Sequence, residues 1–417
     1  MHSISDQAKE LVWRAENSLR DVFSRIDAIE MLNTQRVLDA FWAESISPRH
    51  FSPTNGYGYD DIGRDALDRV FAGAFGCEKA LVRPQFVNGT HAIFTMLAGI
   101  SAPGTEILSI TGAPYDTLIT AIGLSGNAPG SLISSGVQYH EIPLSEQGQI
   151  QLDLVLHHIQ DFKTDIIYLQ RSRGYSWREA IPVASMKNAF SQIRQIRPDI
   201  LIVVDNCYGE FTETEEPVQV GADLMAGSLI KNPGGGLAPT GGYIAGKADL
   251  IDFCAQRLTI PGMGAEVGSY AGSYRLFYQG LFMAPHITAQ CLKSAALFAR
   301  VFESLDLPTL PSSNSIRSDI IQAVQFSTAE ELVSFCQCIQ KSAPIDSNVL
   351  PEPWDMPGYE DQVVMAAGTF VQGATTELSA DGPIRAPYTA YLQGALTYAH
   401  GRIAAMIACD DFLRKRK

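Results

Sequence analysis

Short apolar runs alternate with amphipathic segments between about residues 78 and 250. The runs have the length of buried strands, and the segments between them have the period of helices. This alternation predicts an α/β fold with a mostly parallel sheet sandwiched by helices, and ligands of such sheets bind at the carboxyl ends of the strands. The predicted strands are 80–82, 106–110, 165–169, 200–204 and 242–245, and the predicted helices are 89–100, 115–124, 151–161 and 182–196.

The rest of the chain predicts two flanking units. Helical periodicity before residue 46 indicates a peripheral N-terminal arm, and an Ala-rich apolar stretch at 280–303 predicts a helix that links two lobes. Strand and helix patterns mix beyond this stretch, between several prolines, which indicates a smaller α+β domain. We therefore expect a helical arm at 1–55, a large cofactor-binding α/β domain at 56–280, and a linking helix with a small C-terminal domain at 281–417.

Composition and charge narrow the class of protein. The 417 residues include 31 basic and 45 acidic side chains, and the net charge of −14 argues against a nucleic-acid partner. No apolar run has the ~18–20 residues that a membrane span needs, and the first residues lack the pattern of a signal peptide. The seven cysteines are scattered, as expected for a cytoplasmic protein with reduced thiols. No cysteine or histidine spacing predicts a metal site.

Asp205 and Lys231 indicate a particular chemistry. Asp205 ends the apolar run at 200–204, and Lys231 follows 26 residues later in a turn rich in glycine and serine. Pyridoxal 5′-phosphate (PLP) requires such a pair, because a lysine forms the Schiff base and a carboxylate keeps the pyridine nitrogen protonated. Taken singly, an N-capping aspartate and a surface lysine would explain the same residues. The other motifs of the chain favour the PLP interpretation.

A phosphate site is predicted before this pair. Asn88, Gly89 and Thr90 lie between an apolar segment and a predicted helix. Free N–H groups at the helix N-terminus can face a dianion there, and the glycine lets the backbone come close. Ser228, three residues before Lys231, can add a hydroxyl to the same phosphate. An ordinary N-cap turn is the alternative interpretation of residues 88–90.

Two further side chains fit the substrate side of such a site. Tyr115 begins a predicted helix and could stack on the pyridine ring, with packing in the core as the alternative explanation. Arg385 lies in a turn-forming, weakly polar segment at 380–388 and could grip a substrate carboxylate in a two-pronged bond. A surface salt bridge is the alternative for this arginine.

Five segments together resemble the fold-type-I PLP enzymes of cysteine and methionine metabolism, specifically the methionine γ-lyase-like or aluminium-resistance family of cystathionine β-lyase-like proteins. The segments are 57–64, 85–92, 204–211, 228–236 and 378–385. The resemblance implies the PLP-dependent transferase-like fold, PLP as cofactor, and a homo-oligomer, a dimer or a tetramer of two dimers, with active sites at subunit interfaces. It also implies that Tyr57, Tyr59 and Arg64 reach the PLP phosphate of the neighbouring subunit.

The chain departs from the better-known cystathionine lyases in three places. Asn88, Gly89 and Thr90 stand where those enzymes have Ser-Gly-Met. Ile230 replaces the threonine before their lysine, and Arg64 lies several residues beyond the usual Tyr-x-Arg spacing. These differences leave the expectation of PLP binding intact, but they prevent the transfer of an exact substrate from those enzymes to this chain.

The expected function is a PLP-dependent carbon–sulfur lyase. It would eliminate a thiol from a sulfur-containing amino acid, such as cystathionine, cysteine or a methionine-like compound, and give a keto acid and ammonia. Lys231 would be the general base at Cα, and Asp205 would hold the pyridine proton. Tyr115 would stack on the ring and could protonate the leaving sulfur, while Arg385 would bind the α-carboxylate. An aminotransferase on the same fold is the first alternative and a PLP-binding protein without turnover is the second. The sequence leaves β- and γ-elimination open.

Overall fold

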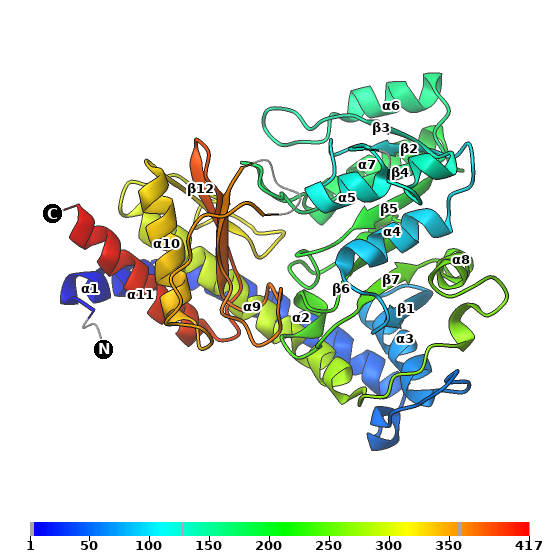
Figure 1. The fold of residues 1–417 in the computed structure, drawn as a ribbon, viewed down its shortest axis with the longest axis horizontal. Coiled ribbons are helices and arrows are strands. Elements are labelled where there is room, and N and C mark those ends of the chain that lie inside the picture. The colour runs from blue at the N-terminus through cyan, green and yellow to red at the C-terminus, as the bar shows by residue number, and fades with distance from the viewer. Residues whose placement is uncertain (1–3, 127, 357–360, 417) are drawn as a thin grey trace.

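The chain folds into two lobes that two long helices connect (Figure 1). This computed structural model describes residues 4–126, 128–356 and 361–416. The large lobe is built on a seven-stranded sheet in the order β1-β7-β6-β5-β4-β2-β3. β7 runs antiparallel to β1 and β6, and the other neighbouring strands are parallel. The strands are β1 (Lys79–Arg83), β2 (Glu106–Ser109), β3 (Gln138–Glu141), β4 (Ile166–Gln170), β5 (Leu201–Asp205), β6 (Leu224–Ser228) and β7 (Gly242–Gly246).

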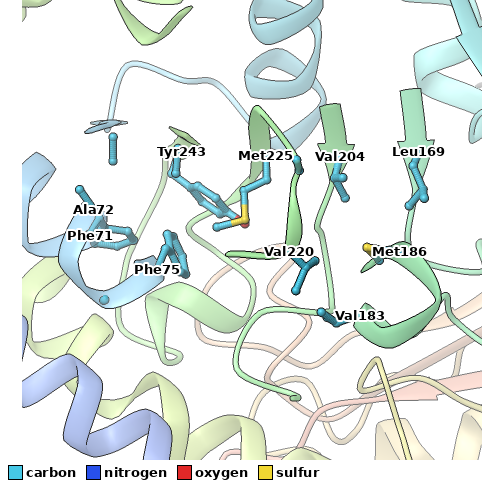
Figure 2. Packing of buried hydrophobic residues seen from close by; sticks show 14 of the residues in the cluster. Phe71, Ala72, Phe75, Leu169, Val183, Met186, Val204, Val220, Met225 and Tyr243 are labelled. Carbon is cyan, nitrogen blue, oxygen red and sulfur yellow. The ribbon is translucent and has the colours of Figure 1, made fainter. Parts of the chain in front are cut away.

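Helices cover both faces of this sheet, which explains why its central strands are apolar throughout. In β5, Ile202 and Val204 face one core and Val203 faces the other. Figure 2 shows the first core, where Phe75 packs against Tyr243 with ring centroids 5.0 Å apart. The covering helices are α3 (Ile62–Phe75), α6 (Leu152–Asp161) and α7 (Val183–Ile196) on that face, and α4 (Gly89–Gly99), α5 (Asp116–Ile122) and α8 (Ala248–Leu258) on the opposite face.

The expected strands and helices of the large lobe are all present, and the predicted α/β fold class is confirmed. Two strands gave no signal in the sequence. β3 is an edge strand of mostly exposed polar residues, so it has no apolar run. β6 ends in Ala226, Gly227 and Ser228, which have low strand propensity, and its place between β5 and β7 compensates for this.

The small lobe contains a five-stranded antiparallel sheet in the order β10-β11-β12-β9-β8. Its core includes Leu332 and Phe335 from a covering helix and Val324 and Leu392 from the sheet. The elements are β8 (Thr309–Leu310), β9 (Gln322–Phe326), β10 (Val363–Ala366), β11 (Ser379–Pro383), β12 (Tyr388–Gln393), α10 (Ala329–Ser342) and α11 (Tyr398–Lys415).

The N-terminal helices are less peripheral than the sequence suggested. α1 (Asp6–Asn17) packs into the core of the small lobe through Val12. α2 (Arg20–Ala43) contributes Val22 to that core and Val37 to the core of the large lobe. It runs beside the predicted linking helix, α9 (Arg275–Glu303), so both helices tie the lobes together (Figure 1). Within the described ranges, no helix combines the length and apolar character needed to cross a membrane.

Candidate active site

A cavity of about 810 Å³ lies between the two lobes, at the carboxyl ends of β4, β5 and β6. Both lobes contribute walls, for example Asp205 from the large lobe and Tyr391 from the small lobe. A cavity of this size can hold a cofactor together with a small substrate. The sequence-predicted residues that line it are Asn88, Gly89, Thr90, Tyr115, Asp205, Ser228, Lys231 and Arg385.

Lys231 lies just beyond β6, with its Nζ atom 3.6 Å from the centroid of the Tyr208 ring. Tyr208 has a φ of 72°, a left-handed conformation that is rare for an aromatic residue. Its carbonyl accepts a hydrogen bond from Asn232 Nδ2 at 3.0 Å, which helps to hold this backbone. Burial raises the pKa of the Tyr208 phenol, and the charge of Lys231 opposes that rise. Sequence reasoning assigned Tyr208 no role, although it lies within the run 204–211.

Asp205 ends β5 at the cavity and is 1% exposed. Its Oδ1 atom accepts a hydrogen bond from the backbone N–H of Cys207 at 3.1 Å. Burial raises the pKa of Asp205, and the positive charge of Lys231 opposes this rise. No ion pair joins Asp205 to a basic side chain in the described ranges. A buried carboxyl in this position can take a protonated ring nitrogen as its hydrogen-bonded partner.

The residues predicted to bind a phosphate form one corner of the cavity. Asn88 caps α4 by accepting a hydrogen bond from the N–H of His91 at 2.8 Å. Ser228 Oγ is buried and has no hydrogen-bond partner among the described residues. A Cβ atom at Gly89 would lie 3.0 Å from Ser228 Cβ, so a side chain there would crowd this corner. The helix N-terminus and the unsatisfied hydroxyl fit a phosphate group.

We expect Ser228→Ala to affect cofactor affinity and protein stability differently. The Kd for PLP should rise about 10–100-fold, because a hydrogen bond to a charged group is worth about 1.5–3 kcal/mol. The free energy of unfolding of the cofactor-free protein should not fall, since the hydroxyl makes no hydrogen bond to any residue that the structure describes. Equilibrium dialysis with PLP and urea unfolding measure the two quantities.

Ser294→Ala provides the matched control for this prediction. Ser294 Oγ is also buried without a partner in the described ranges, but it lies on α9 outside the cavity. This control should leave the Kd for PLP unchanged. An unchanged Kd in Ser228→Ala as well would remove Ser228 from the phosphate site.

Tyr115 lies beside the phosphate corner. Its hydroxyl donates a hydrogen bond to Thr90 Oγ1 at 2.9 Å, and its backbone N–H donates to Gln170 Oε1 at 2.9 Å. Gln170 pairs with Asp205 in the sheet register, so the tyrosine is fixed next to the predicted ring site. Burial and then the charge of Asp205 raise the pKa of Tyr115, so its phenol is protonated at neutral pH and can act as a donor.

Arg385 lies on the small-lobe side of the cavity, in the hairpin between β11 and β12. Its side chain is 54% exposed and forms an ion pair with Asp361 Oδ2 at 3.0 Å. The structure therefore contains the surface salt bridge that was the alternative interpretation, and it also places the guanidinium at the cavity. A carboxylate binding role for Arg385 stays a prediction.

The segment with Tyr57, Tyr59 and Arg64 lies outside the cavity of its own chain. The two tyrosines are exposed and their rings stack with centroids 5.4 Å apart. Arg64 is buried and donates hydrogen bonds to the carbonyl of Gly58 and to Asp65 Oδ1, both at 2.8 Å. A single chain therefore leaves the tyrosines available for contact and directs Arg64 into its own loop. Their role at a neighbouring subunit stays a prediction.

The fold of this chain also occurs in more distant solved structures. The PLP-dependent protein YhfS from Escherichia coli has the same fold, with a TM-score of 0.62 over 94% of this chain and 97% of that chain, at 14% identity. This likeness places the chain in the fold-type-I group of structures and shows the fold alone.

Closer relatives identify the family. The methionine γ-lyase family model matches residues 8–413. Protein YnbB of Bacillus subtilis is 47% identical over 409 residues, which cover 98% of this chain and 97% of YnbB. A carbon–sulfur lyase involved in aluminium resistance from Clostridium novyi is 48% identical, with a TM-score of 0.94 over 98% of this chain and 96% of that chain. The chain belongs to the methionine γ-lyase family and is an enzyme of the PLP-dependent carbon–sulfur lyase class.

Proposed function

We propose that this protein binds PLP on Lys231 and eliminates a thiol from a sulfur-containing amino acid such as cystathionine, cysteine or a methionine-like compound. The observation that carries the proposal is the convergence of Lys231, Asp205 and a phosphate-binding corner on one cavity. Membership of the methionine γ-lyase family supports the same reaction class. The products of β-elimination are a thiol, pyruvate and ammonia, with one water consumed. The products of γ-elimination are a thiol, 2-oxobutyrate and ammonia, again with one water consumed.

The residues of the cavity fit the cofactor. Asn88, Gly89, Thr90 and Ser228 would hold the phosphate through the N-terminus of α4 and the unsatisfied hydroxyl. Tyr115 would lie against the ring. When bound, PLP supplies an electron sink for the charge that develops at the substrate Cα.

Four side chains would carry out the proton transfers and position the reacting groups. The Lys231 amine would remove the proton from Cα, and Tyr208 beneath it would fix its approach. Asp205 would keep the proton on the ring nitrogen, because this buried carboxyl lies at the cavity and no basic side chain in the described ranges forms an ion pair with it. Arg385 would exchange its exposed pair with Asp361 for the α-carboxylate of the substrate.

Product analysis tests the proposed reaction. Purified protein with PLP is given cystathionine, cysteine, methionine and homocysteine without a keto-acid acceptor. A lyase releases thiol, ammonia and keto acid in equal amounts over many turnovers, and the keto acid shows whether elimination is β or γ. An aminotransferase stops after one equivalent of keto acid per site and releases no thiol, which would overturn the proposal.

We also propose that the protein is a homo-oligomer with shared active sites. Tyr57 and Tyr59 are exposed aromatic side chains that lie close together, and such residues are common at protein interfaces. They would contact the active site of a second copy across a two-fold axis. A single chain would then lack part of its own site.

Mixing of inactive chains tests this assembly. Chains with Tyr57→Ala and Tyr59→Ala should be weak, and Lys231→Ala chains should be inactive. An equal mixture should regain about one quarter of wild-type activity, because half of the random dimers are mixed and one site in each mixed dimer is intact. Mass spectrometry would first demonstrate that the subunits have exchanged. If the activity of the exchanged mixture does not rise, the tyrosines act within their own chain or have no role.

A further inference from the structure

One carboxyl on the cavity wall, that of Asp381, forms no ion pair with any of the described residues. Asp381 lies on β11, opposite Met365 of β10 and Tyr391 of β12 in the sheet register. Its carboxyl accepts a hydrogen bond from Tyr175, and no basic side chain forms an ion pair with it in the described part of the chain. The nearby Arg385 is already paired with Asp361. Burial raises the pKa of Asp381 to about 7, although the hydrogen bond from Tyr175 opposes this rise.

Asp381 lies on the small-lobe side of the reacting lysine. It acts electrostatically on the phenol of Tyr208, the ring that lies 3.6 Å from Lys231 Nζ. It also acts on Tyr391, whose ring centroid is 5.2 Å from that of Tyr175. The carboxyl is therefore near the catalytic centre and is bordered by aromatic rings.

The surroundings of the Asp381 carboxyl are suited to binding an organic ammonium ion. A carboxylate provides a charged hydrogen-bond acceptor, and tyrosine faces attract cations. Asp381 is partly buried, and a carboxylate that is shielded from water without a counter-charge is costly, so a cationic ligand would be stabilised by it. The α-amino group of the substrate is committed to the cofactor, and its α-carboxylate is assigned to Arg385. The ammonium must therefore belong to the part of the substrate that leaves with sulfur.

We propose that Asp381, with Tyr175 and Tyr391, forms a subsite for an ammonium group on the leaving thiol, so that Asp381 sets a preference for thioether amino acids whose sulfur substituent carries an amine. The inference rests on the proposed lyase function and specifies the class of substrate for the same site. A structural role for Asp381 would affect all substrates alike, whereas the subsite affects only those with the distal charge.

Two substrates of matched size test the subsite. S-(2-aminoethyl)-L-cysteine and S-propyl-L-cysteine have the same chain length and differ by an ammonium in place of a methyl group. Their leaving thiols differ in acidity, so the quantity compared is the ratio of the two kcat/KM values in wild type and in each variant. Asp381→Asn should lower this ratio about 10–100-fold, the range expected for a hydrogen bond to a charged group.

Asp361→Asn is the matched control, since it removes a carboxyl on the same wall that is already paired with Arg385. In the Asp361→Asn variant, the ratio of the two kcat/KM values should equal the ratio in the wild type. Asp381→Ser removes the same charge with a shorter side chain and gives a second measurement of the ratio if the asparagine variant does not fold.

The outcomes separate the inference from the lyase proposal. A lower ratio in the Asp381 variants alone supports the subsite. Equal loss of kcat/KM for both substrates, or an unchanged ratio, overturns the subsite and leaves the lyase function standing. If wild-type protein releases thiol or sulfide from no sulfur-containing amino acid, the lyase proposal and the inference both fall; if it acts on cysteine but on no thioether amino acid, only the inference falls.

Discussion

Lys231→Ala is expected to abolish thiol release while the protein still binds PLP. Removal of the amine eliminates both the covalent anchor and the base at Cα, and loss of a general base alone costs about 10²–10⁴-fold in rate. The phosphate corner around Ser228 and the carboxyl of Asp205 do not depend on this side chain, so noncovalent binding of PLP should persist. The measurements are kcat with a thioether substrate and the PLP content after gel filtration.

Lys247→Ala is the control for this result. Lys247 is an exposed lysine that pairs with Asp223, and it lies outside the cavity. This variant should retain both activity and a covalent link to PLP that borohydride can reduce. Turnover close to that of wild type in Lys231→Ala would assign the base to another residue.

Asp205→Asn is expected to reduce kcat by about 10²–10⁴-fold, which at ~1.4 kcal/mol per tenfold corresponds to about 3–6 kcal/mol of lost stabilisation. An amide cannot keep the ring nitrogen protonated, so charge at Cα would be poorly stabilised. The asparagine oxygen can still accept the hydrogen bond from the N–H of Cys207. The local fold and the binding of PLP should therefore survive.

Exchange of the substrate Cα proton for deuterium, followed by NMR, isolates the step that Asp205 would affect. The exchange rate should fall together with kcat in Asp205→Asn, whereas the PLP content should match that of wild type. An exchange rate close to the wild-type value would exclude this role for Asp205. A loss of bound PLP would assign the residue to binding in place of catalysis.

The central strands could be predicted from sequence because they are buried on both faces. Ile202, Val203 and Val204 form a continuous apolar run, since alternate side chains enter different cores. β3 could not be found, because its exposed position at the edge of the sheet requires no apolar residues. The placement of α1 in the small-lobe core also depends on contacts with residues far along the chain, which a local pattern does not encode.

The parts of the site that follow a local rule were predictable. Three features of the site have a chemical reason that can be recognised in the sequence. They are an acid at the end of a strand, a lysine in a glycine-rich turn and a glycine at a helix N-terminus. Tyr208 and Asp381 have no such rule. Tyr208 acquires its position from an unusual backbone conformation, and Asp381 becomes part of the site only because the small lobe closes over the large lobe.

Peptide mapping of wild-type protein after borohydride reduction tests the central assignment most directly. The protein is purified with PLP, reduced, digested and analysed by mass spectrometry for the lysine that carries the pyridoxyl group. We expect one labelled peptide that contains Lys231, with no label there when reduction is omitted. A label on another lysine, or no label in protein that is saturated with PLP, would show that Lys231 does not carry the cofactor.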